Sequence, residues 1–483
     1  MTTSAVLTTG IYCRAGCPAT PNERNVVRYR SPVAAEAAGF RPCLRCRPDR
    51  LPPAFTANGA PEPVHRALML IGEGALDETG EDELGGRVGL SGRQLRRVFL
   101  DHVGATPAFV ARSRRAHFAR RLLDETDLTV TEIAFAAGFN SVRQMNRVVL
   151  DTFHFSPTEL RAKRRQRDRL VADGGLPLRA PYAGALSFDE MLAFLGARAV
   201  PGVEAVGGET YRRTITACGH PGVIEVSDLG DGRHLQVIAH LPTFNALIDD
   251  VTRVRRIFGL DHPPADKIPA LAEDPWLKPL IAARPGLRLV GSWDRFETAI
   301  RIVVSQQISL RGARTILGRL VREFGSPVPG VEALGLTHVF PSAERLAAAS
   351  EGEIAALGMP GARATTIRSL ARAYAAEEIS LEPRRDLNRI VEQLEALPGI
   401  GSWTAQCIAM RAAGHLDAFP AGDLGLRRVA SNLAGHSVTA AELAERAEAW
   451  RPYRALAAMH LWARHPTTAP WVKGRGSGVK ETQ

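Results

Sequence analysis

Apolar and polar positions follow the same order twice along the chain, in residues 91–107 and again in residues 141–157. In each copy, an apolar stretch with helical spacing and a glycine turn lead to a serine that can cap a new helix. This order predicts two helix-turn-helix units whose second helices begin near Ser91 and Ser141. The matching positions, at an offset of 50, are Ser91/Ser141, Arg93/Arg143, Gln94/Gln144, Leu95/Met145, Arg97/Arg147, Val98/Val148, Asp101/Asp151 and Pro107/Pro157.

The second half of the chain changes from a strand pattern to a helical one. Apolar runs separated by glycine-rich turns predict strands at 214–217, 223–227 and 235–240. From about residue 244 onward, the apolar spacing is that of amphipathic helices. An α+β part followed by a helical part is therefore expected.

Three stretches separate these patterned regions. Residues 51–63 are rich in proline and glycine, and residues 161–169 form a basic run at the expected end of a helix. The tail after Val472 is polar and is expected to be disordered. The chain therefore divides into blocks at about 1–50, 64–165 and 178–472.

Composition and charge narrow the class of protein. The 483 residues suffice for roughly three or four domains, and 45% hydrophobic residues are typical of globular chains. The sequence contains no apolar run of about eighteen residues and no apolar leader. We therefore expect neither a membrane span nor secretion. Most of the net charge of +10 lies in the first 170 residues, which carry 26 Lys and Arg against 18 Asp and Glu. This basic front third favours a nucleic-acid partner.

Four of the six cysteines lie close together near the start of the chain, as Cys13 and Cys17 and then Cys43 and Cys46. Two close pairs of thiolates suit a tetrahedral Zn²⁺ ion, which favours a metal site over disulfides. A block of about 50 residues has a small core, so the metal would supply much of its folding free energy. One interpretation is a zinc module that only shapes the fold.

The sequence around these cysteines closely resembles the N-terminal domain of the Ada family of alkylation-response proteins, in Ile-Tyr-Cys13-Arg-Ala-Gly-Cys17-Pro and Gly-Phe40-Arg41-Pro-Cys43-Leu-Arg-Cys46-Arg-Pro-Asp49. The resemblance implies that the Cys13 thiolate irreversibly takes the methyl group of a methyl phosphotriester in DNA. Four thiolates on one Zn²⁺ are net negative, and methylation would remove one charge and tighten DNA binding. Arg41, Arg45 and Arg47 would then contact phosphates, unless they form only a solvated basic face.

The doubled helix-turn-helix resembles the AraC-type DNA-binding domain, in which two units meet successive segments of the major groove. Arginine suits guanine, and glutamine or asparagine suits adenine. Leu95, Val98, Met145 and Val148 are expected in the core; the alternative to DNA reading is a helix bundle that merely carries arginines. The positions predicted to read DNA are Arg93, Gln94, Arg97, Arg143, Gln144, Asn146 and Arg147.

A second DNA-binding motif is Leu397-Pro398-Gly399-Ile400-Gly401-Ser402-Trp403. Here one helix is expected to end, a hairpin to follow and another helix to start. The backbone amides of Gly399, Ile400 and Gly401 can then approach a DNA phosphate without reading sequence. Such hairpins also occur in proteins that are not enzymes. The loop aspartate Asp423 follows, and this combination resembles the helix-hairpin-helix DNA glycosylases.

Two absences refine the expected reaction. Members of this superfamily that also cut the strand carry a lysine just after the hairpin, where this chain has Trp403. No cysteine follows Cys407, so the iron–sulfur cluster of several relatives cannot form. Hydrolytic base removal without strand cleavage is therefore expected.

Residues 178–472 as a whole resemble the AlkA-type 3-methyladenine glycosylases. The resemblance implies that an N-alkylated base is extruded into a pocket while Asp423 stabilises an oxocarbenium-like sugar. Trp403, Trp462 and Phe194 would offer aromatic faces to the electron-poor base, although such residues are often simply core. The matching stretches include residues 191–204, 284–289, 356–360 and 460–462.

Two positions depart from this family. Gln307 stands where the best-known member inserts an apolar wedge into the duplex and is expected to meet the DNA there. Cys407 replaces a pocket aromatic. Both changes would affect base flipping and the range of accepted bases.

These patterns together predict a multidomain, mainly α chain with α+β parts. The expected domains are a zinc methyl-acceptor domain (1–50), a double helix-turn-helix domain (64–165), an α+β part resembling the TATA-binding protein (178–290) and a helix-hairpin-helix glycosylase core (291–472). One Zn²⁺ per chain is expected, with a monovalent cation at the hairpin as a further candidate. Expected partners are alkylated and promoter double-stranded DNA and, during activation, RNA polymerase. The chain is expected to be a monomer in the bacterial cytoplasm, associated with the nucleoid.

The main hypothesis is a bifunctional protein: methyl transfer to Cys13 activates transcription, and a hydrolytic 3-methyladenine glycosylase begins base excision repair. One alternative is a transcription regulator whose C-terminal domain only binds damaged DNA. Another is a glycosylase that its front domains merely tether to DNA. Repair of O6-methylguanine is not expected, because the Pro-Cys-His-Arg motif of full-length Ada proteins is absent and Cys218 has other neighbours.

Overall fold

The computed structural model describes residues 3–14, 17–19, 21–48, 60–164, 175–382 and 386–464. Most of the predicted linker (51–59), the end of the basic run (165–169) and the tail after Val472 lie outside these residues. The chain forms two compact units, Met1–Ala183 with Ile215–Arg256 and Gly184–Thr214 with Ile257–Gln483. Along the described residues, no helix has the length and apolar character needed to cross a membrane.

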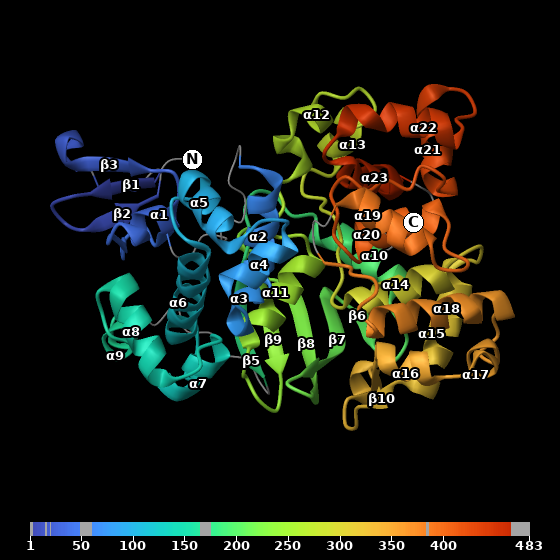
Figure 1. The fold of residues 1–483 in the computed structure, drawn as a ribbon, viewed down its shortest axis with the longest axis horizontal. Helices are drawn as coiled ribbons and strands as arrows, with labels where there is room; N and C mark the ends of the chain where they lie inside the picture. Colours follow the sequence, from blue (N-terminus) through green and yellow to red (C-terminus); the bar gives the residue numbers. More distant parts are fainter. Residues whose placement is uncertain are drawn as a thin grey trace, which may run out of the picture. The chain divides into compact units, whose positions relative to one another are not determined.

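The N-terminal module is a small sheet with one helix and one 3-10 turn: β1 (Thr3–Val6), β2 (Ile11–Cys13), η1 (Glu23–Asn25), β3 (Val26–Tyr29), α1 (Pro32–Ala37) and β4 (Arg41–Pro42). The strand order is β3-β1-β2-β4, drawn in dark blue in Figure 1. β1 pairs antiparallel with β2 and β3, whereas β2 and β4 run parallel. The buried core contains Ala5, Tyr12 and Ala35, with Tyr29 and Phe40 packed against it. So few buried side chains give little folding free energy, as the length of the block predicted.

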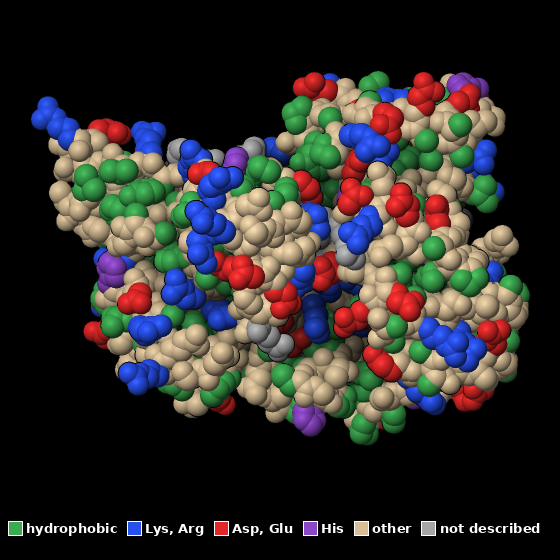
Figure 2. All heavy atoms as spheres, viewed as in Figure 1, with side chains coloured by type: hydrophobic (Ala, Val, Ile, Leu, Met, Phe, Trp, Pro, Cys, Tyr) green, Lys and Arg blue, Asp and Glu red, His purple; other side chains and the backbone are tan. Residues whose placement is uncertain are grey.

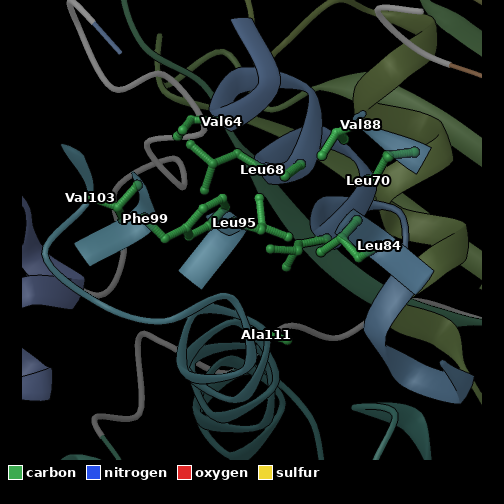
Figure 3. Packing of buried hydrophobic residues seen from close by; sticks show 11 residues of the cluster. Val64, Leu68, Leu70, Leu84, Val88, Leu95, Phe99, Val103 and Ala111 are labelled. Atoms are coloured by element: carbon green, nitrogen blue, oxygen red, sulfur yellow. The ribbon is translucent and has the colours of Figure 1, made fainter. Parts of the chain in front are cut away.

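A bundle of short helices follows, formed by α2 (Glu62–Gly72), α3 (Ala75–Glu78), α4 (Glu81–Arg87) and α5 (Gly92–His102). Its core includes Leu68, Leu84, Leu95 and Phe99, which point toward one another in Figure 3. Full burial of side chains of this size stabilises the fold by roughly 1.5–3 kcal/mol each. The Ser91 hydroxyl accepts a hydrogen bond from the N–H of Gln94, so α5 begins where the sequence predicted.

A long helix, α6 (Pro107–Glu125), connects this bundle with a second one, formed by α7 (Val130–Ala136), α8 (Val142–Phe153) and α9 (Pro157–Ala162). The Ser141 hydroxyl caps α8 by accepting the N–H of Gln144, and Met145 is fully buried. Gly89 and Gly138 adopt positive φ in the turns before the two capped helices. α4–α5 and α7–α8 are therefore the two predicted helix-turn-helix units.

The α+β part contains the three predicted strands and two that the sequence did not indicate. β7 (Thr210–Ala217), β8 (His220–Asp228) and β9 (His234–His240) cover the predicted runs, and β5 (Leu176–Pro181) and β6 (Glu204–Gly207) extend the sheet to the order β5-β9-β8-β7-β6. β5 contains Pro177 and Pro181, which cannot donate to a strand ladder and so hide the strand pattern. They are tolerated because β5 is an edge strand. The helices of this part are α10 (Phe188–Arg198) and α11 (Leu247–Ile257).

The remaining chain is helical, as predicted, apart from two short paired strands. Ile300, Leu320, Ile367 and Ile408 lie fully buried in its core. The elements are η4 (Ala265–Lys267), α12 (Pro269–Ala272), α13 (Lys278–Ala283), α14 (Arg295–Val304), α15 (Leu310–Phe324), β10 (Ser326–Pro327), η5 (Glu332–Leu334), β11 (His338–Val339), α16 (Ala343–Ala348), α17 (Glu351–Ala355), α18 (Gly361–Ala375), α19 (Leu387–Glu395), α20 (Ser402–Arg411), α21 (Leu424–Ala434), α22 (Ala440–Ala447), η6 (Glu448–Trp450) and α23 (Arg454–Arg464).

Candidate functional site

The four clustered cysteines meet at one end of the N-terminal sheet. Cys13 is the last residue of β2, and Cys43 directly follows β4. Because these strands run side by side in parallel, both residues leave the sheet at the same end, where the N–H of Cys43 donates to the Tyr12 carbonyl over 3.0 Å. The Sγ atoms of Cys13, Cys17, Cys43 and Cys46 all lie within 4.8 Å of one another. One tetrahedral Zn²⁺ can bind sulfur atoms so arranged.

The electrostatics of the cluster also fit a bound cation. Burial, the contact with Cys17 and the charges of the other thiols raise the pKa of Cys13, and burial raises the pKa of Cys46 to about 11. At Cys43, backbone N–H donors outweigh burial and lower the pKa. Four adjacent thiolates thus repel one another, and a divalent metal supplies the charge that balances them. Within the described residues, no other group of cysteine, histidine or acidic side chains is arranged to hold a metal.

The arginines expected to contact phosphate near this cluster differ in their surroundings. Arg45 is exposed, and half-buried Arg41 holds its guanidinium carbon 5.5 Å from the ring centre of Phe155. Arg47 instead pairs with Asp124 of α6, at 2.6 Å between Nη2 and Oδ2, and the Asp124 side chain is only 2% exposed. Arg47 therefore has a partner within the protein, and its contact with phosphate stays a prediction.

A buried carboxylate joins the N-terminal module to α6. Glu36 accepts hydrogen bonds from the hydroxyls of Tyr12 and Ser113, each over 2.5 Å, and lies 2.6 Å from Nε2 of His117. Although burial opposes it, His117 lowers the pKa of Glu36. Tyr12 precedes Cys13, so this junction begins beside the thiol cluster. Sequence reasoning missed it because the partners lie 24, 77 and 81 residues apart and leave no local pattern.

Both recognition helices expose most of the residues predicted to read DNA. In Figure 2, lysine and arginine side chains gather over the part of the molecule that Figure 1 labels α5 and α6. Leu95 and Met145 are fully buried, and Val148 is nearly so, as expected of core positions. Of the residues predicted to read DNA, the exposed ones are Arg93, Gln94, Arg97, Arg143, Asn146 and Arg147.

The two predicted glutamines act as helix caps. Oε1 of Gln94 accepts from the N–H of Ser91 over 2.9 Å, and Oε1 of Gln144 accepts from the N–H of Asn140 over 3.1 Å. A bidentate contact with adenine uses both the oxygen and the nitrogen of the amide. Each glutamine would have to release its cap to make that contact.

The hairpin motif lies between α19 and α20, as predicted. Gly399 has a φ of +78°, and a Cβ there would lie 2.1 Å from Thr366 Oγ1, so only glycine fits. Gly401 caps α20 without a side chain, which leaves the first N–H groups of α20 open to an anion such as a phosphate. Nε2 of Gln306 braces the motif by donating to the Gly399 carbonyl over 3.0 Å and to Thr404 Oγ1 over 2.9 Å. Ile400 is 5% exposed, so its backbone is the part that can meet DNA.

Asp423 is the centre of a second polar cluster. It caps α21, and its Oδ1 accepts from the N–H of Leu426 over 3.0 Å. The indole N–H of Trp462 donates to Oδ1 over 3.0 Å, and that of Trp403 donates to Oδ2 over 3.1 Å. The structure thus brings together three residues singled out in the sequence. It also shows the tryptophans in a role that sequence reasoning missed, orienting the carboxylate through their N–H groups.

Phe194, 9% exposed on α10, lies against two arginines that the sequence did not single out. The guanidinium carbon of Arg198 is 3.8 Å from the centre of the Phe194 ring, and that of Arg411 is 4.8 Å away. Cys407 lies one turn before Arg411 on α20 and is buried. Burial and the charge of Asp423 raise the pKa of the Cys407 thiol, which therefore stays neutral. Helical spacing of Phe194 with Arg198, and of Cys407 with Arg411, is the signal that could have found these arginines.

Gln307 lies in the turn between α14 and α15. Its side chain is exposed and its φ is +55°, in the left-handed region. Such a backbone costs roughly 1 kcal/mol or more for a residue with a side chain, and strain of this kind gathers at functional loops. The neighbouring Gln306 binds the hairpin, so this turn and the hairpin are connected.

Models of four protein families match successive parts of the chain. They are the metal binding domain of Ada (residues 3–49), a helix-turn-helix domain (84–163), the AlkA N-terminal domain (175–294) and the HhH-GPD superfamily base excision DNA repair protein (300–454).

Individual relatives match the whole chain or one part of it. A probable bifunctional transcriptional activator/DNA repair enzyme AlkA of Mycobacterium tuberculosis is 40% identical over 471 residues, which are 96% of this chain and 93% of the relative. The DNA-3-methyladenine glycosylase 2 of Escherichia coli is 31% identical over 56% of this chain and 92% of its own length. The bifunctional transcriptional activator/DNA repair enzyme Ada of Escherichia coli is 33% identical over 32% of this chain and 43% of its own length.

A solved structure shares the fold of the second half. It is a 3-methyladenine DNA glycosylase from Archaeoglobus fulgidus, with a TM-score of 0.52 and 24% identity, covering 59% of this chain and 97% of that protein. At this identity the likeness shows the fold alone.

Proposed function

Because the chain belongs to the family of bifunctional transcriptional activator/DNA repair enzymes AlkA, we propose that it joins a methyl-sensing regulator of transcription to a hydrolytic DNA glycosylase. Its domains provide zinc binding, helix-turn-helix DNA binding and DNA-3-methyladenine glycosylase activity in the response to alkylation. The observation that carries the proposal is the placement of Asp423, held by Trp403 and Trp462, close after the hairpin motif.

Asp423 stabilises the sugar from which the base departs. An N-alkylated purine is cationic and leaves without a general acid, so positive charge develops on the sugar. The half-buried carboxylate is oriented in advance by two indole N–H groups and faces this charge without first reorganising. Its remaining lone pairs position the water that completes hydrolysis. Trp403 cannot form a Schiff base, so the reaction stops at the abasic site.

Replacing the carboxylate tests this assignment. Asp423→Asn keeps the size of the side chain and an acceptor for the helix cap while removing the negative charge. We expect single-turnover release of 3-methyladenine from methylated DNA to slow at least about 100-fold while DNA binding persists. Glu445→Gln, at an exposed carboxylate on α22, is the matched control and should behave as wild type. Undiminished release by Asp423→Asn would overturn the assignment; no release by the wild type would leave a module that only binds damaged DNA.

Cys13 accepts the methyl group in the N-terminal module. When bound, Zn²⁺ keeps the cysteines deprotonated near neutral pH. The Cys13 sulfur attacks the methyl carbon of a methyl phosphotriester, the carbon–oxygen bond breaks, and the phosphate diester leaves with the electron pair. Cys13 and Cys17 are partly buried, whereas Cys43 and Cys46 are buried. The thioether carries no charge, so DNA phosphates then bind more tightly next to Arg41 and Arg45.

The methyl transfer is tested by mass spectrometry on the zinc-loaded full chain. After incubation with DNA that carries methyl phosphotriesters, we expect one added methyl group on the Cys13 peptide and a parallel rise in DNA affinity. Cys13→Ser should abolish both, whereas Cys218→Ser, an exposed cysteine outside the cluster, should change neither. An unchanged mass with zinc still bound would reduce the cluster to a structural site.

Several finer features belong to the same proposal. The domains are 1–50, 64–165, 178–290 and 291–472, and Arg93, Arg97, Arg143, Asn146 and Arg147 read promoter DNA. The protein acts as a monomer in the cytoplasm, associated with the nucleoid, and contacts RNA polymerase during activation. A monovalent cation at the hairpin stays a prediction.

Promoter footprinting before and after methylation separates this activator from a glycosylase that is merely tethered to DNA, because only the activator gains a methylation-dependent footprint.

A further inference from the structure

The turn between α14 and α15 contains two neighbouring glutamines with different surroundings. Gln307 is exposed, whereas Gln306 is half-buried. Nε2 of Gln306 donates to the Gly399 carbonyl over 3.0 Å and to Thr404 Oγ1 over 2.9 Å. The residue that is expected to meet the duplex therefore directly follows a residue that binds the hairpin.

Two further elements fix the backbone of the same turn. Arg363, in the first turn of α18, donates from Nη2 to the Gln306 carbonyl over 2.6 Å. The N–H of Gln306 donates to the Val303 carbonyl, near the end of α14, over 3.2 Å. The side chain and both backbone groups of one residue are thus bound by three different parts of the glycosylase fold.

These bonds hold Gln307 in a backbone conformation that it would otherwise leave. Its φ of +55° lies in the left-handed region, which residues with a side chain rarely adopt. Such a conformation persists only where the surrounding structure over-determines it. The Gln306 carbonyl belongs to the planar peptide group directly before Gln307, so Arg363 fixes the plane from which this φ is measured. Without these bonds, the turn can relax and redirect the Gln307 side chain.

Gln306 also contacts both the hairpin and helix α20, which supports Asp423. Gly399 belongs to the hairpin whose backbone is expected to meet a DNA phosphate. Thr404 directly follows Trp403 on α20, and the Trp403 indole N–H donates to Asp423. One side chain therefore connects the exposed turn with the part that binds the DNA backbone and with the part that carries the carboxylate.

We propose, resting on the glycosylase function above, that Gln306 and Arg363 form a brace of positioning residues that holds Gln307 ready to enter the duplex when the hairpin binds DNA. Extruding a base costs stacking and pairing energy, which contacts made on opening must offset. An exposed side chain on a fixed turn fills the gap left by the base with less loss of entropy than one on a mobile turn. The brace acts on opening of the duplex and not on cleavage of the bond to the base.

The test compares one lesion in two duplexes that differ in the energy needed to open them. In the first duplex, 7-methylguanine is paired with cytosine; in the second, it lies opposite an abasic site and has no partner. Gln306→Met keeps the length of the side chain but removes the donor to Gly399 and Thr404. We expect single-turnover release to fall about tenfold for the paired lesion and less than about twofold for the unpaired one.

Two more comparisons separate positioning from general stability. Arg363→Met should show the same selective loss, because it frees the peptide group before Gln307, and Arg363→Lys keeps a donor and should restore part of the rate. Gln306→Met combined with Gln307→Ala should release the paired base no more slowly than Gln307→Ala alone, since the brace acts through that side chain.

A matched control is available on α19. Gln393 also donates from Nε2 to a backbone carbonyl, that of Glu378, over 3.2 Å, but does not belong to this turn. Gln393→Met therefore removes the same kind of hydrogen bond and should leave both release rates unchanged.

The fluorescence of 2-aminopurine placed beside the lesion follows opening directly, because this base brightens when its stacked neighbour leaves. Asp423→Asn, which slows release, allows the signal to be read before the base is lost. In this background, we expect Gln306→Met to lower the signal of the paired duplex at least about twofold and to leave that of the unpaired duplex unchanged.

The outcomes distinguish the brace from a structural role and from a failure of the proposed function. An equal fall of both release rates in Gln306→Met would show a merely structural role and overturn the proposal, as would an unchanged rate for the paired lesion. Additive losses in the double variant would also overturn it, because Gln306 would then act by another route. A wild type that releases 7-methylguanine from neither duplex would mean that the glycosylase function itself has failed, and the proposal with it.

Discussion

A carboxylate that must meet positive charge works best when its orientation is settled before the reaction starts. Asp423 receives three N–H donors, from Trp403, Trp462 and Leu426, and is left half-exposed. Each indole therefore has two separable properties, an aromatic face and an N–H group that donates to the carboxylate. Substitutions that remove only one property can tell them apart.

Trp403→Phe keeps an aromatic face and removes the donor to Asp423 Oδ2. We expect kcat for 3-methyladenine release to fall about tenfold with little change in KM, because one hydrogen bond to a charged group is worth roughly 1.5 kcal/mol or more. Trp276→Phe is the control, since Trp276 packs against Arg446 outside this cluster. A change in KM alone would show that Trp403 acts only by stacking.

A buried histidine makes the stability of the glycosylase part sensitive to acid. Burial and the charge of Arg284 lower the pKa of His460 to about 4. The unfolded chain, with an ordinary value of about 6.5, binds a proton that the folded chain excludes. The contribution of His460 to stability is therefore complete above about pH 6.5 and is lost as the pH falls toward 4. We expect it to lower the free energy of unfolding by about 2 kcal/mol between pH 7 and pH 5.

Urea unfolding at both pH values measures this effect. Every tryptophan of the chain lies after residue 257, so tryptophan fluorescence follows only the second compact unit. Wild type should lose more stability between the two pH values than His460→Gln. Equal losses in both proteins would show that another group controls the acid response.

Among the elements, the hairpin between α19 and α20 has the sharpest steric requirement. Gly399→Ala would place a Cβ against Thr366 of α18 in a left-handed backbone. We expect it to lower the free energy of unfolding by about 1–3 kcal/mol and to weaken binding to undamaged DNA.

The same motif supplies the control for this prediction. A Cβ at Gly401 meets nothing within 4 Å, and the backbone there is extended. Gly401→Ala should therefore stay within a few tenths of a kcal/mol of wild type. If both variants lose the same stability, the contact with Thr366 does not account for the glycine.

At the scale of the molecule, the compact units do not follow the order of the domains. The first unit contains the N-terminal module, both helix-turn-helix units and strands β5, β8 and β9 of the α+β part. Ion pairs across these segments include Arg114–Asp249 at 3.0 Å and Arg256–Glu73 at 2.7 Å, in pairs that are mostly shielded from water. The helix-turn-helix part is therefore in direct contact with helix α11 of the α+β part.

Removing zinc should separate the two activities. Cys13, Cys17, Cys43 and Cys46 lie in the first unit, and Asp423 with its partners lies in the second. A strong chelator should expose the four thiols to a thiol reagent and abolish methyl transfer, because the small N-terminal core depends on the metal. Release of 3-methyladenine and tryptophan fluorescence should stay within about twofold of the untreated protein. An equal loss of both activities would show that the metal also supports the glycosylase.

Features that act over a few residues were determined by the sequence alone. Ser91 and Ser141 predicted where two helices begin, because a cap and the apolar spacing after it are local. The cysteine pairs, the glycine hairpin and the strands β7 to β9 were predictable for the same reason. The edge strand β5 was missed, because its prolines hide a pattern that only its place in the sheet permits.

The partners of polar side chains were decided only by the tertiary structure. Glu36 meets Ser113 and His117, Arg47 meets Asp124, and Arg411 meets the Phe194 ring, although these partners are far apart in the chain. No periodicity records such pairs, since each depends on how separate helices and strands pack together. Residue types and spacing therefore determined which chemistry the chain carries. Packing decided which carboxylate the tryptophans orient and which cations lie over the Phe194 ring.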